Sequence, residues 1–427
     1  MHVRFMQLVD FWVGVPLCAA LSIASSIISL FRSPTPIPPR KVLFIELSEM
    51  GSAILSYSAL VKAQKLAGGA VPYFLIFRRN RESCEILNFL PNDRILVIND
   101  RSFPEFAFSA FRTLLRLRAE RFDTVIDLEL FSRFTAILTF LSGAANRIGF
   151  HRHTWEGLYR GNFLTHRVNY NPHQHISLSF LALVSALEAP HDEVPMVKRD
   201  VRSDLVPLPQ RVASPAEKEP IWTLLQSLNA RITPRSTLLL FNPDPGDQLP
   251  IRGWPEERFA EVASALLEKY PDSFAAIIGL SGSKPYADRF MQHVGGDRCV
   301  DLSGQTRSIA ELLVVFDCAA LLVTNDSGPV HFASLCNLPT VVLFGPETPA
   351  LYGPLGGRAI TLFSHFACSP CLSALNHRHT WCHDSKCLKA ISTEEVVDAC
   401  RQALSFLGIT GTRPHASLRV LNDSKYR

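Results

Sequence analysis

The chain has 427 residues, which is more than one ordinary hydrophobic core accommodates and predicts two domains. Apolar residues make up 47% and charged residues 19%, a balance compatible with a folded globular protein that has some membrane character. The net charge of +4 is mild and the sequence carries no nucleic-acid-binding motif, so these properties argue against a nucleic-acid partner.

The N-terminal segment is strongly apolar. Residues Phe11 to Phe31 include no charged side chain, and the run is long enough to cross a bilayer. No convincing signal-peptide cleavage site follows it, and basic residues on its C-terminal side favour a cytoplasmic location for the bulk of the chain. Pro16 is compatible with a kinked or re-entrant helix; a helix on the membrane surface and one buried against the protein are further alternatives. We expect membrane association through residues 11–31, with residues 1–36 forming a hydrophobic segment and linker.

Strands and helices alternate over residues 37–205. Short apolar runs predict the strands, and amphipathic stretches between them predict the helices. This alternation predicts an α/β domain with a parallel, doubly wound sheet. The expected strands are Val42–Leu47, Tyr73–Phe77, Arg94–Ile98, Thr124–Leu128 and Arg147–Phe150; the expected helices are Gly51–Leu66, one that ends near Leu90, Phe106–Ala119, Phe131–Leu141 and Pro172–Leu187.

Arginines are frequent in this first half. Solvated helix faces account for many of them, and an anionic acceptor or an anionic lipid surface is the sharper alternative. The cluster comprises Arg112, Arg116, Arg118, Arg121, Arg133, Arg147, Arg152, Arg160 and Arg167.

A polar, proline-rich stretch from Asp200 to Glu219 interrupts the alternation, and we place the domain boundary between residues 205 and 206. The alternation then resumes in a second domain, residues 206–409, which is followed by a weakly ordered tail, residues 410–427. The expected strands are Thr237–Phe241, Phe274–Ile278, Leu321–Val323 and Thr340–Phe344; the expected helices are Glu256–Lys269, Tyr286–His293, Ile309–Phe316 and Thr393–Leu407.

The stretch from Leu321 to Glu347 reads as strand, tight turn, helix, strand and loop. Residues 325–328 supply turn and N-cap chemistry, and Pro329 suits the first turn of a helix, where its missing N–H costs little. Backbone N–H groups at such a helix start, beside the carboxylate of Asp326 and the imidazole of His331, can hold an anion such as a diphosphate.

One combination of residues in this stretch is far more specific than the turn alone: Asp326, Ser327, Gly328, His331 and Phe344-Gly345-Pro346. It resembles the lipopolysaccharide heptosyltransferases, the ADP-heptose-using members of glycosyltransferase family 9. Further similar segments occur in the family's order between Lys41 and Leu407. The resemblance implies a GT-B fold, in which two Rossmann-like domains face each other across a cleft and the ligand lies at the carboxyl ends of the strands.

The resemblance also implies a donor site. The family's Asn-Pro-Gly turn is similar to residues 242–246, and its basic residue before Trp-Pro is matched by Arg252. Arg252 would hold the donor diphosphate bidentately, opposite the backbone of residues 327–328, and stabilise the leaving nucleoside diphosphate. Asp326 would bind sugar hydroxyls, and His331 either orients the phosphate or is structural. The full expected donor-binding set is Arg252, Asn242, Thr324, Asp326, Ser327, Gly328, His331 and Gly345.

The turn after the first strand is the expected acceptor side. Gly51 lets the backbone turn tightly into the helix. Family members commonly have an aspartate after this glycine, taken as the catalytic base, where this chain has Ser52, whose hydroxyl cannot accept a proton near neutral pH. Glu49 lies three residues earlier on the same turn, and we predict that it is the base rather than a solvent-facing loop glutamate.

Four cysteines near the C-terminus, Cys368, Cys371, Cys382 and Cys387, form a C-x2-C-x10-C-x4-C pattern. The spacing could hold a structural Zn²⁺, although similar cysteines recur in some relatives without implying a metal. Cytoplasmic placement argues against permanent disulfides. No catalytic metal or other cofactor is expected, because Arg252 and helix dipoles can neutralise the leaving group without Mg²⁺.

The resemblance implies an inverting glycosyltransferase that moves a sugar, with heptose from ADP-heptose as the expected donor group. The expected acceptor is a lipopolysaccharide core or another lipid-linked glycan at the cytoplasmic face of the bacterial inner membrane. The missing family aspartate keeps two alternatives open. One is a catalytically impaired, membrane-tethered nucleotide-sugar-binding protein; the other is a GT-B-fold enzyme that does other chemistry on a nucleotide sugar, as epimerases do.

Overall fold

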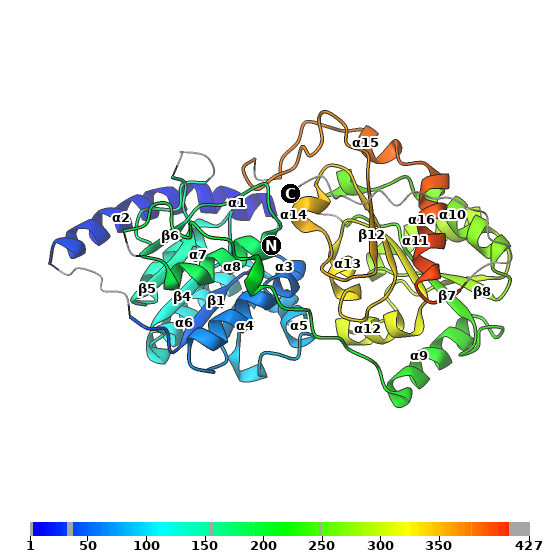
Figure 1. Cartoon of the computed structure of the whole chain (residues 1–427), viewed down its shortest axis with the longest axis horizontal. Helices are drawn as coiled ribbons and strands as arrows, with labels where there is room; N and C mark the ends of the chain where they lie inside the picture. Colours follow the sequence, from blue (N-terminus) through cyan, green and yellow to red (C-terminus); the bar gives the residue numbers. More distant parts are fainter. Residues whose placement is uncertain are drawn as a thin grey trace.

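The computed structural model describes residues 3–31, 37–153, 158–190, 192–246, 249–376 and 378–409. The predicted tail, residues 410–427, and part of the N-terminal linker lie outside the described residues. Two halves lie side by side, and each is built on a six-stranded parallel sheet with helices packed against it (Figure 1). The α/β fold class predicted from the alternation of strands and helices is therefore confirmed.

The first half is built on sheet A. Its strands are β1 (Val42–Ile45), β2 (Tyr73–Phe77), β3 (Ile95–Ile98), β4 (Thr124–Asp127), β5 (Asn146–Phe150) and β6 (His166–Val168), in the order β3-β2-β1-β4-β5-β6. Every side chain of β1 and β4 is buried, as in strands covered on both faces. One face is covered by α3 (Met50–Leu55), α4 (Tyr57–Leu66), α5 (Arg81–Glu85) and α8 (Ile176–Ser185). The other face is covered by α6 (Phe103–Glu120) and α7 (Arg133–Leu141).

The second half is built on sheet B. Its strands are β7 (Thr237–Asn242), β8 (Ser273–Ile277), β9 (Cys299–Asp301), β10 (Leu321–Asn325), β11 (Thr340–Phe344) and β12 (Ala359–Phe363), in the order β12-β11-β10-β7-β8-β9. One apolar face is covered by α10 (Glu256–Lys269), α11 (Lys284–Val294) and α16 (Thr393–Ser405). The other is covered by α9 (Pro215–Leu228), α12 (Ile309–Cys318) and α13 (Gly328–Ala333). Two short helices, α14 (Pro349–Tyr352) and α15 (Lys386–Lys389), complete this half.

Both sheets have the same strand order relative to the chain, and that order reverses next to the first strand of each. The reversal lies between β1 and β4 in sheet A and between β7 and β10 in sheet B. In open α/β sheets, ligands bind outside the carboxyl ends of the strands at this point. The loops that follow these four strands are therefore where the fold builds a site.

The N-terminal segment forms two consecutive helices, α1 (Val3–Trp12) and α2 (Gly14–Phe31), that lie along the first half (Figure 1). By length and composition alone, residues 5–31 could cross a membrane, and most of this stretch is not buried. One side of α2 packs on α7, with Cys18 fully buried against Ala136 and Phe163. The helix is therefore partly buried against the protein, which was one of the alternatives left open by its sequence.

Most expected elements occur within a few residues of their predicted bounds, with three kinds of difference. The helix expected over residues 51–66 is divided at Ser56 into α3 and α4. The helix expected from Pro172 begins instead at Ile176, because His175 is its N-cap and its side chain accepts a hydrogen bond from Ser177 N. Strands β6, β9 and β12 and helices α1, α9, α14 and α15 were not predicted.

Candidate active site

The turn after β1 places Glu49 at the start of α3. Glu49 is the N-cap residue, with extended backbone dihedral angles (φ −118°, ψ 117°), so its carboxylate projects from the helix start. Ser52 Oγ donates a hydrogen bond of 3.1 Å to Glu49 Oε2. The serine at the family's aspartate position therefore contacts the predicted base and helps to orient it.

Arg378 links this turn to the second half of the molecule. Its Nη1 forms an ion pair with Glu49 Oε1, and its Nε lies 2.9 Å from Glu347 Oε1. Glu347 Oε2 lies 3.7 Å from Arg252 Nη1, which is 3.4 Å from Asp326 Oδ2. Carboxylates and guanidinium groups thus alternate along one network, from Glu49 of the first half to Asp326 of the second.

These neighbours determine the protonation states in the network. Burial raises the pKa of Glu49, but the Arg378 guanidinium and hydrogen bonds from Arg378 and Ser52 outweigh it, so that the pKa lies below its ordinary value. Burial raises the pKa of Glu347 to about 7, despite two nearby arginines. Burial also raises the pKa of Asp326. Glu49 is therefore ionised at neutral pH, as a base must be, whereas Glu347 titrates near neutrality.

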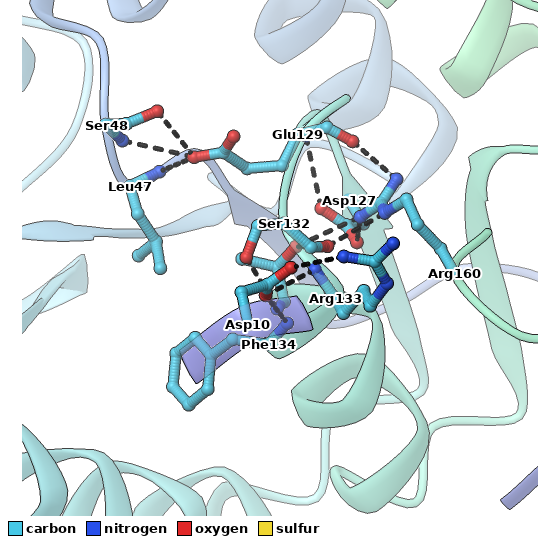
Figure 2. Close-up of polar contacts among 10 residues, drawn as sticks. Asp10, Leu47, Ser48, Asp127, Glu129, Ser132, Arg133, Phe134 and Arg160 are labelled. Atoms are coloured by element: carbon cyan, nitrogen blue, oxygen red, sulfur yellow. Dashed lines mark hydrogen bonds and ion pairs between the residues drawn. The ribbon is translucent and has the colours of Figure 1, made fainter. Parts of the chain in front are cut away.

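A second carboxylate holds the backbone of the turn after β1 in place (Figure 2). Glu129 Oε1, just after β4, accepts hydrogen bonds from Leu47 N (2.9 Å), Ser48 N (3.1 Å) and Ser48 Oγ (2.9 Å). Arg160 donates to the backbone oxygen of Glu129 and forms a buried ion pair with Asp127, the last residue of β4. The position of the residue next to Glu49 is therefore fixed by bonds to the neighbouring strand end.

The donor-side residues predicted from the sequence are connected by short polar contacts between the ends of β7 and β10. Asn242 Nδ2 donates to Thr324 Oγ1 and to Ser327 Oγ, each at 3.1 Å. Ser327 is the N-cap residue of α13, and its side chain forms no hydrogen bond with the helix start. Gly328 has only the Phe332 ring within 4 Å of a hypothetical Cβ, at 3.7 Å. This corner leaves room beside the backbone of Ser327 and Gly328.

His331 and Gly345 lie in tightly packed surroundings. A Cβ at Gly51 would lie 2.5 Å from His331 Cδ2, so the histidine ring packs directly on the backbone of the other half. Burial lowers the pKa of His331 to about 4, so its imidazole is neutral near pH 7. A Cβ at Gly345 would lie 2.5 Å from Leu388 Cγ, so packing alone requires glycine there. A phosphate contact by either residue stays a prediction.

The two halves enclose a small cavity beside Glu49. Its volume is about 20 Å³, and its lining includes Glu46, Glu129, Tyr352 and Arg378. The halves also meet away from this cavity, where His175 Nε2 donates to Gly353 O at 2.8 Å and Ile309 N donates to Glu82 Oε2 at 2.6 Å. The candidate site therefore lies at the interface between the two domains.

The four spaced cysteines lie in the loop around Arg378 and α15, and all four are free thiols. No group of three or more His, Cys, Asp or Glu side chains is arranged to hold a metal in the described part of the chain, which omits His377. Thr380 Oγ1 contacts Cys371 Sγ, and Cys382 Sγ contacts Asp384, each at 3.4 Å. The zinc site stays a prediction, which elemental analysis of protein purified without chelator would decide.

Three residues of the candidate site were not identified from the sequence: Arg378 and Glu347 of the network, and Glu129, which holds the turn after β1. Glu347 and Glu129 each come a few residues after a strand end, and the rule that ligands bind at such ends is the signal that would have found them. Arg378 follows no strand and belongs to the cysteine-rich loop, so nothing in its local sequence marks it.

Comparison with known proteins identifies the family. A model of glycosyltransferase family 9 (heptosyltransferase) matches residues 110–382, which is more than half of the chain. This chain belongs to glycosyltransferase family 9. The resemblance noted in the motif around Asp326 is thereby confirmed.

Individual relatives agree with this family assignment. The lipooligosaccharide heptosyltransferase 2 of Haemophilus ducreyi is 29% identical over 224 residues, which are 50% of this chain and 59% of that relative. The match thus spans less than two thirds of the length of that relative.

Solved structures share the fold. The Escherichia coli ADP-heptose LPS heptosyltransferase II aligns with a TM-score of 0.64 at 20% identity and covers 86% of this chain and 100% of that one. A family 9 glycosyltransferase from Veillonella parvula aligns with a TM-score of 0.66 at 19% identity, covering 87% and 99%. At these identities the likeness supports the GT-B arrangement of this family 9 chain and carries no conclusion about its substrates.

Proposed function

We propose that this family 9 protein is an inverting glycosyltransferase whose base is Glu49. The observation that carries the proposal is the network in which Glu49 of the first domain meets Arg378, Glu347 and Arg252 of the second. An ionised carboxylate on the acceptor side then lies opposite cationic groups suited to a diphosphate.

The proposed reaction is a single displacement. The acceptor hydroxyl attacks the anomeric carbon of the donor sugar and gives its proton to a carboxylate oxygen of Glu49. The bond between the anomeric carbon and the diphosphate oxygen breaks, and the nucleoside diphosphate leaves with the bonding electrons. Arg252 stabilises the charge that develops on the leaving group, and the backbone of Ser327 and Gly328 contributes further donors.

The ion pair between Arg378 and Glu49 limits the basicity of Glu49 before the donor binds. While Arg378 is paired with Glu49, the carboxylate is a weak base, because its pKa is lowered. A bound donor diphosphate would compete for the same guanidinium, since phosphate oxygens accept bidentate bonds from arginine. Partial release of Glu49 would raise its basicity when the donor is present. Glu347, whose pKa is about 7, can take up a proton and limit the charge in the site.

The proposed donor is ADP-heptose and the proposed acceptor a lipopolysaccharide-type or other lipid-linked glycan. The names of the relatives support both, because lipooligosaccharide heptosyltransferase 2 and ADP-heptose LPS heptosyltransferase II describe that chemistry for those proteins. The proposed location is the cytoplasmic face of the inner membrane, with association through residues 11–31. The long apolar run of the N-terminal helices supports it.

The experiment that tests the proposal uses the full-length protein in detergent or nanodiscs with a panel of nucleotide sugars and a lipid-linked acceptor. We expect binding of ADP-heptose, formation of a glycosylated acceptor and release of ADP in equal amounts. Donor binding without transfer to any acceptor would favour the nucleotide-sugar-binding alternative. Conversion of the free nucleotide sugar without an acceptor would favour the epimerase-like one.

A further inference from the structure

Helix α6 exposes a row of large apolar side chains on its outer side. Phe108 is 63%, Phe111 60% and Leu115 54% exposed, and their spacing of three and four residues puts them along one stripe. The opposite side of the same helix is already buried in the domain, where Leu117 and Phe106 pack on sheet A. A surface helix normally carries polar residues on its outer side, so this second apolar stripe indicates contact with an apolar partner.

Arginines flank this stripe and line a hollow next to it. The hollow has a volume of about 600 Å³, and the charged side chains that line it are four arginines and two carboxylates: Arg78, Arg81, Arg112, Arg116, Asp93 and Glu105. Phe108 also belongs to its lining. Arg112 lies over the Phe108 ring, and Arg81 and Arg116 are paired with the half-buried Glu85 and Glu120. Apolar side chains beside arginines match the boundary between the acyl chains and the anionic headgroups of a lipid leaflet.

The N-terminal helices lie on the same side of sheet A as α6. Helix α2 packs on α7, which shares this face with α6, and Phe5 of α1 contacts Phe103 at the start of α6, with ring centroids 5.9 Å apart. The outer sides of α1 and α2 are also apolar and exposed. Their exposed large side chains include Phe5, Leu8, Trp12, Ile23, Ile27 and Phe31.

Polar bonds hold these helices against the domain (Figure 2). Asp10 Oδ1 accepts hydrogen bonds from Arg133 N (2.8 Å) and Phe134 N (3.0 Å) at the start of α7, and its Oδ2 pairs with Arg133 Nη1 at 3.0 Å. Ser22 Oγ of α2 accepts a bond of 2.8 Å from Asn162 N. A helix that crosses the bilayer perpendicular to the surface would have to break these bonds and expose Cys18.

We propose that α1, α2 and the outer stripe of α6 form one surface that lies in the plane of an anionic phospholipid leaflet, with lipid phosphates at the arginines of α6. The apolar stripe enters the acyl region, and the docked N-terminal helices enter beside it without crossing. The proposal rests on the membrane association proposed above and adds its geometry: the acceptor domain itself touches the lipid.

Site-specific photocrosslinking of the full-length protein in nanodiscs of phosphatidylethanolamine and phosphatidylglycerol tests the geometry. Benzoylphenylalanine replaces one of three exposed residues: Ile23 on α2, Phe111 on α6, or Leu280, which is 82% exposed in the second half. We expect lipid adducts at positions 23 and 111 and none at 280. Adducts at 23 alone would overturn the proposal and leave membrane association intact, whereas adducts at none of the three would overturn both.

The same experiment also tests whether a second copy of the chain covers α6. Adducts between two protein chains at position 111, in place of lipid adducts, would show that a second copy covers α6 and would overturn the proposal.

The double variant Arg112→Glu/Arg116→Glu should reduce lipid adducts at 111 by about tenfold or more, since each arginine near an anionic surface contributes to binding. The matched control Arg235→Glu/Lys284→Glu, on exposed residues of the second half, should leave the yield unchanged. If both double variants give the same yield of lipid adducts at position 111, the arginines of α6 do not contact lipid headgroups, and that part of the proposal is wrong.

Discussion

Glu49 is the residue whose replacement most directly tests catalysis. Glu49→Gln keeps the shape and the acceptor oxygen but removes the basicity, so turnover should fall by about 10²–10⁴-fold with donor affinity nearly unchanged. Ser52→Ala is the matched control, because it removes only the 3.1 Å bond to Glu49 and should have a small effect. Steady-state kinetics and donor titration measure both quantities. Full activity of Glu49→Gln would assign the base to another carboxylate.

Replacing Arg378 should change the pH dependence of turnover. Its guanidinium opposes the effect of burial on Glu49, so Arg378→Met should raise the pKa of Glu49. The base is active when deprotonated, and the acid side of the plot of kcat against pH should therefore move to higher pH. The control is Arg258→Met, which removes an arginine that donates to the backbone oxygens of Lys389 and Ile391 and forms no ion pair with Glu49. An acid limb that stays at the wild-type pH would show that Glu49 does not govern it.

Replacing Arg252 should weaken donor binding. Arg252→Ala should weaken nucleotide-sugar affinity by about 2–3 kcal/mol, because the lost contacts to a diphosphate are charge-assisted. It should also slow turnover, since the leaving group loses a stabilising charge. Arg252→Lys retains the charge but not the bidentate geometry and should lie between the two. Calorimetric titration with donor measures the change, and wild-type affinity in Arg252→Ala would remove this residue from the diphosphate site.

The candidate site could be proposed in part from the sequence, because Glu49, Arg252 and Asp326 each belong to a loop that follows a strand of recognisable sequence. Their roles stay predictions. Arg378 could not, because its role depends on how the two halves pack: it meets Glu49 only once a loop of the second domain reaches the first. Ser52 stands where family members commonly have an aspartate, and this difference suggested that the usual base is missing. Its actual contact with Glu49 required the backbone geometry of the helix start.

At the scale of elements, the attachment of α1 rests on Asp10. Asp10→Ala leaves the Arg133 side chain, which is 7% exposed, without its ionic partner, and should lower the free energy of unfolding by about 3 kcal/mol. Asp10→Asn keeps an oxygen for the two backbone N–H groups and should cost less. Chemical denaturation of the full chain in one detergent compares them, and protease cleavage near residue 31 reports release of the helix. Equal stability of all three proteins would show that Asp10 does not hold α1.

The element bounds that were predicted best are those of buried segments. Strands β2 and β11 and helix α10 match their expected ranges, because each is an apolar or amphipathic run with clear turn residues around it. Strands β6, β9 and β12 are edge strands, two of them only three residues long, and lack the burial on both faces that makes a strand visible in sequence. Helix α9 was missed because it begins at Pro215 and contains Pro220, in a stretch whose composition resembles a linker.

At the scale of the whole molecule, the contact between Gly51 and His331 sets how closely the two domains approach. A Cβ at position 51 would lie 2.5 Å from His331 Cδ2, so Gly51→Ala should hold the domains apart. We expect a larger radius of gyration by small-angle X-ray scattering and reduced turnover, with donor affinity retained because the donor residues belong to the second domain. Gly282→Ala is the control, since nothing lies within 4 Å of its hypothetical Cβ. An unchanged radius of gyration would mean that the histidine ring moves instead.

The absence of a side chain at residue 51 thus makes the separation of the domains adjustable in single-atom steps. A series from glycine through alanine and serine to valine would insert spacers of increasing size at one point of the interface. Plotting turnover against the measured separation would give the distance over which Glu49 can still reach the acceptor hydroxyl that attacks the anomeric carbon of the donor sugar. That curve would describe the reach of the base as a length, obtained without changing any charged group in the site.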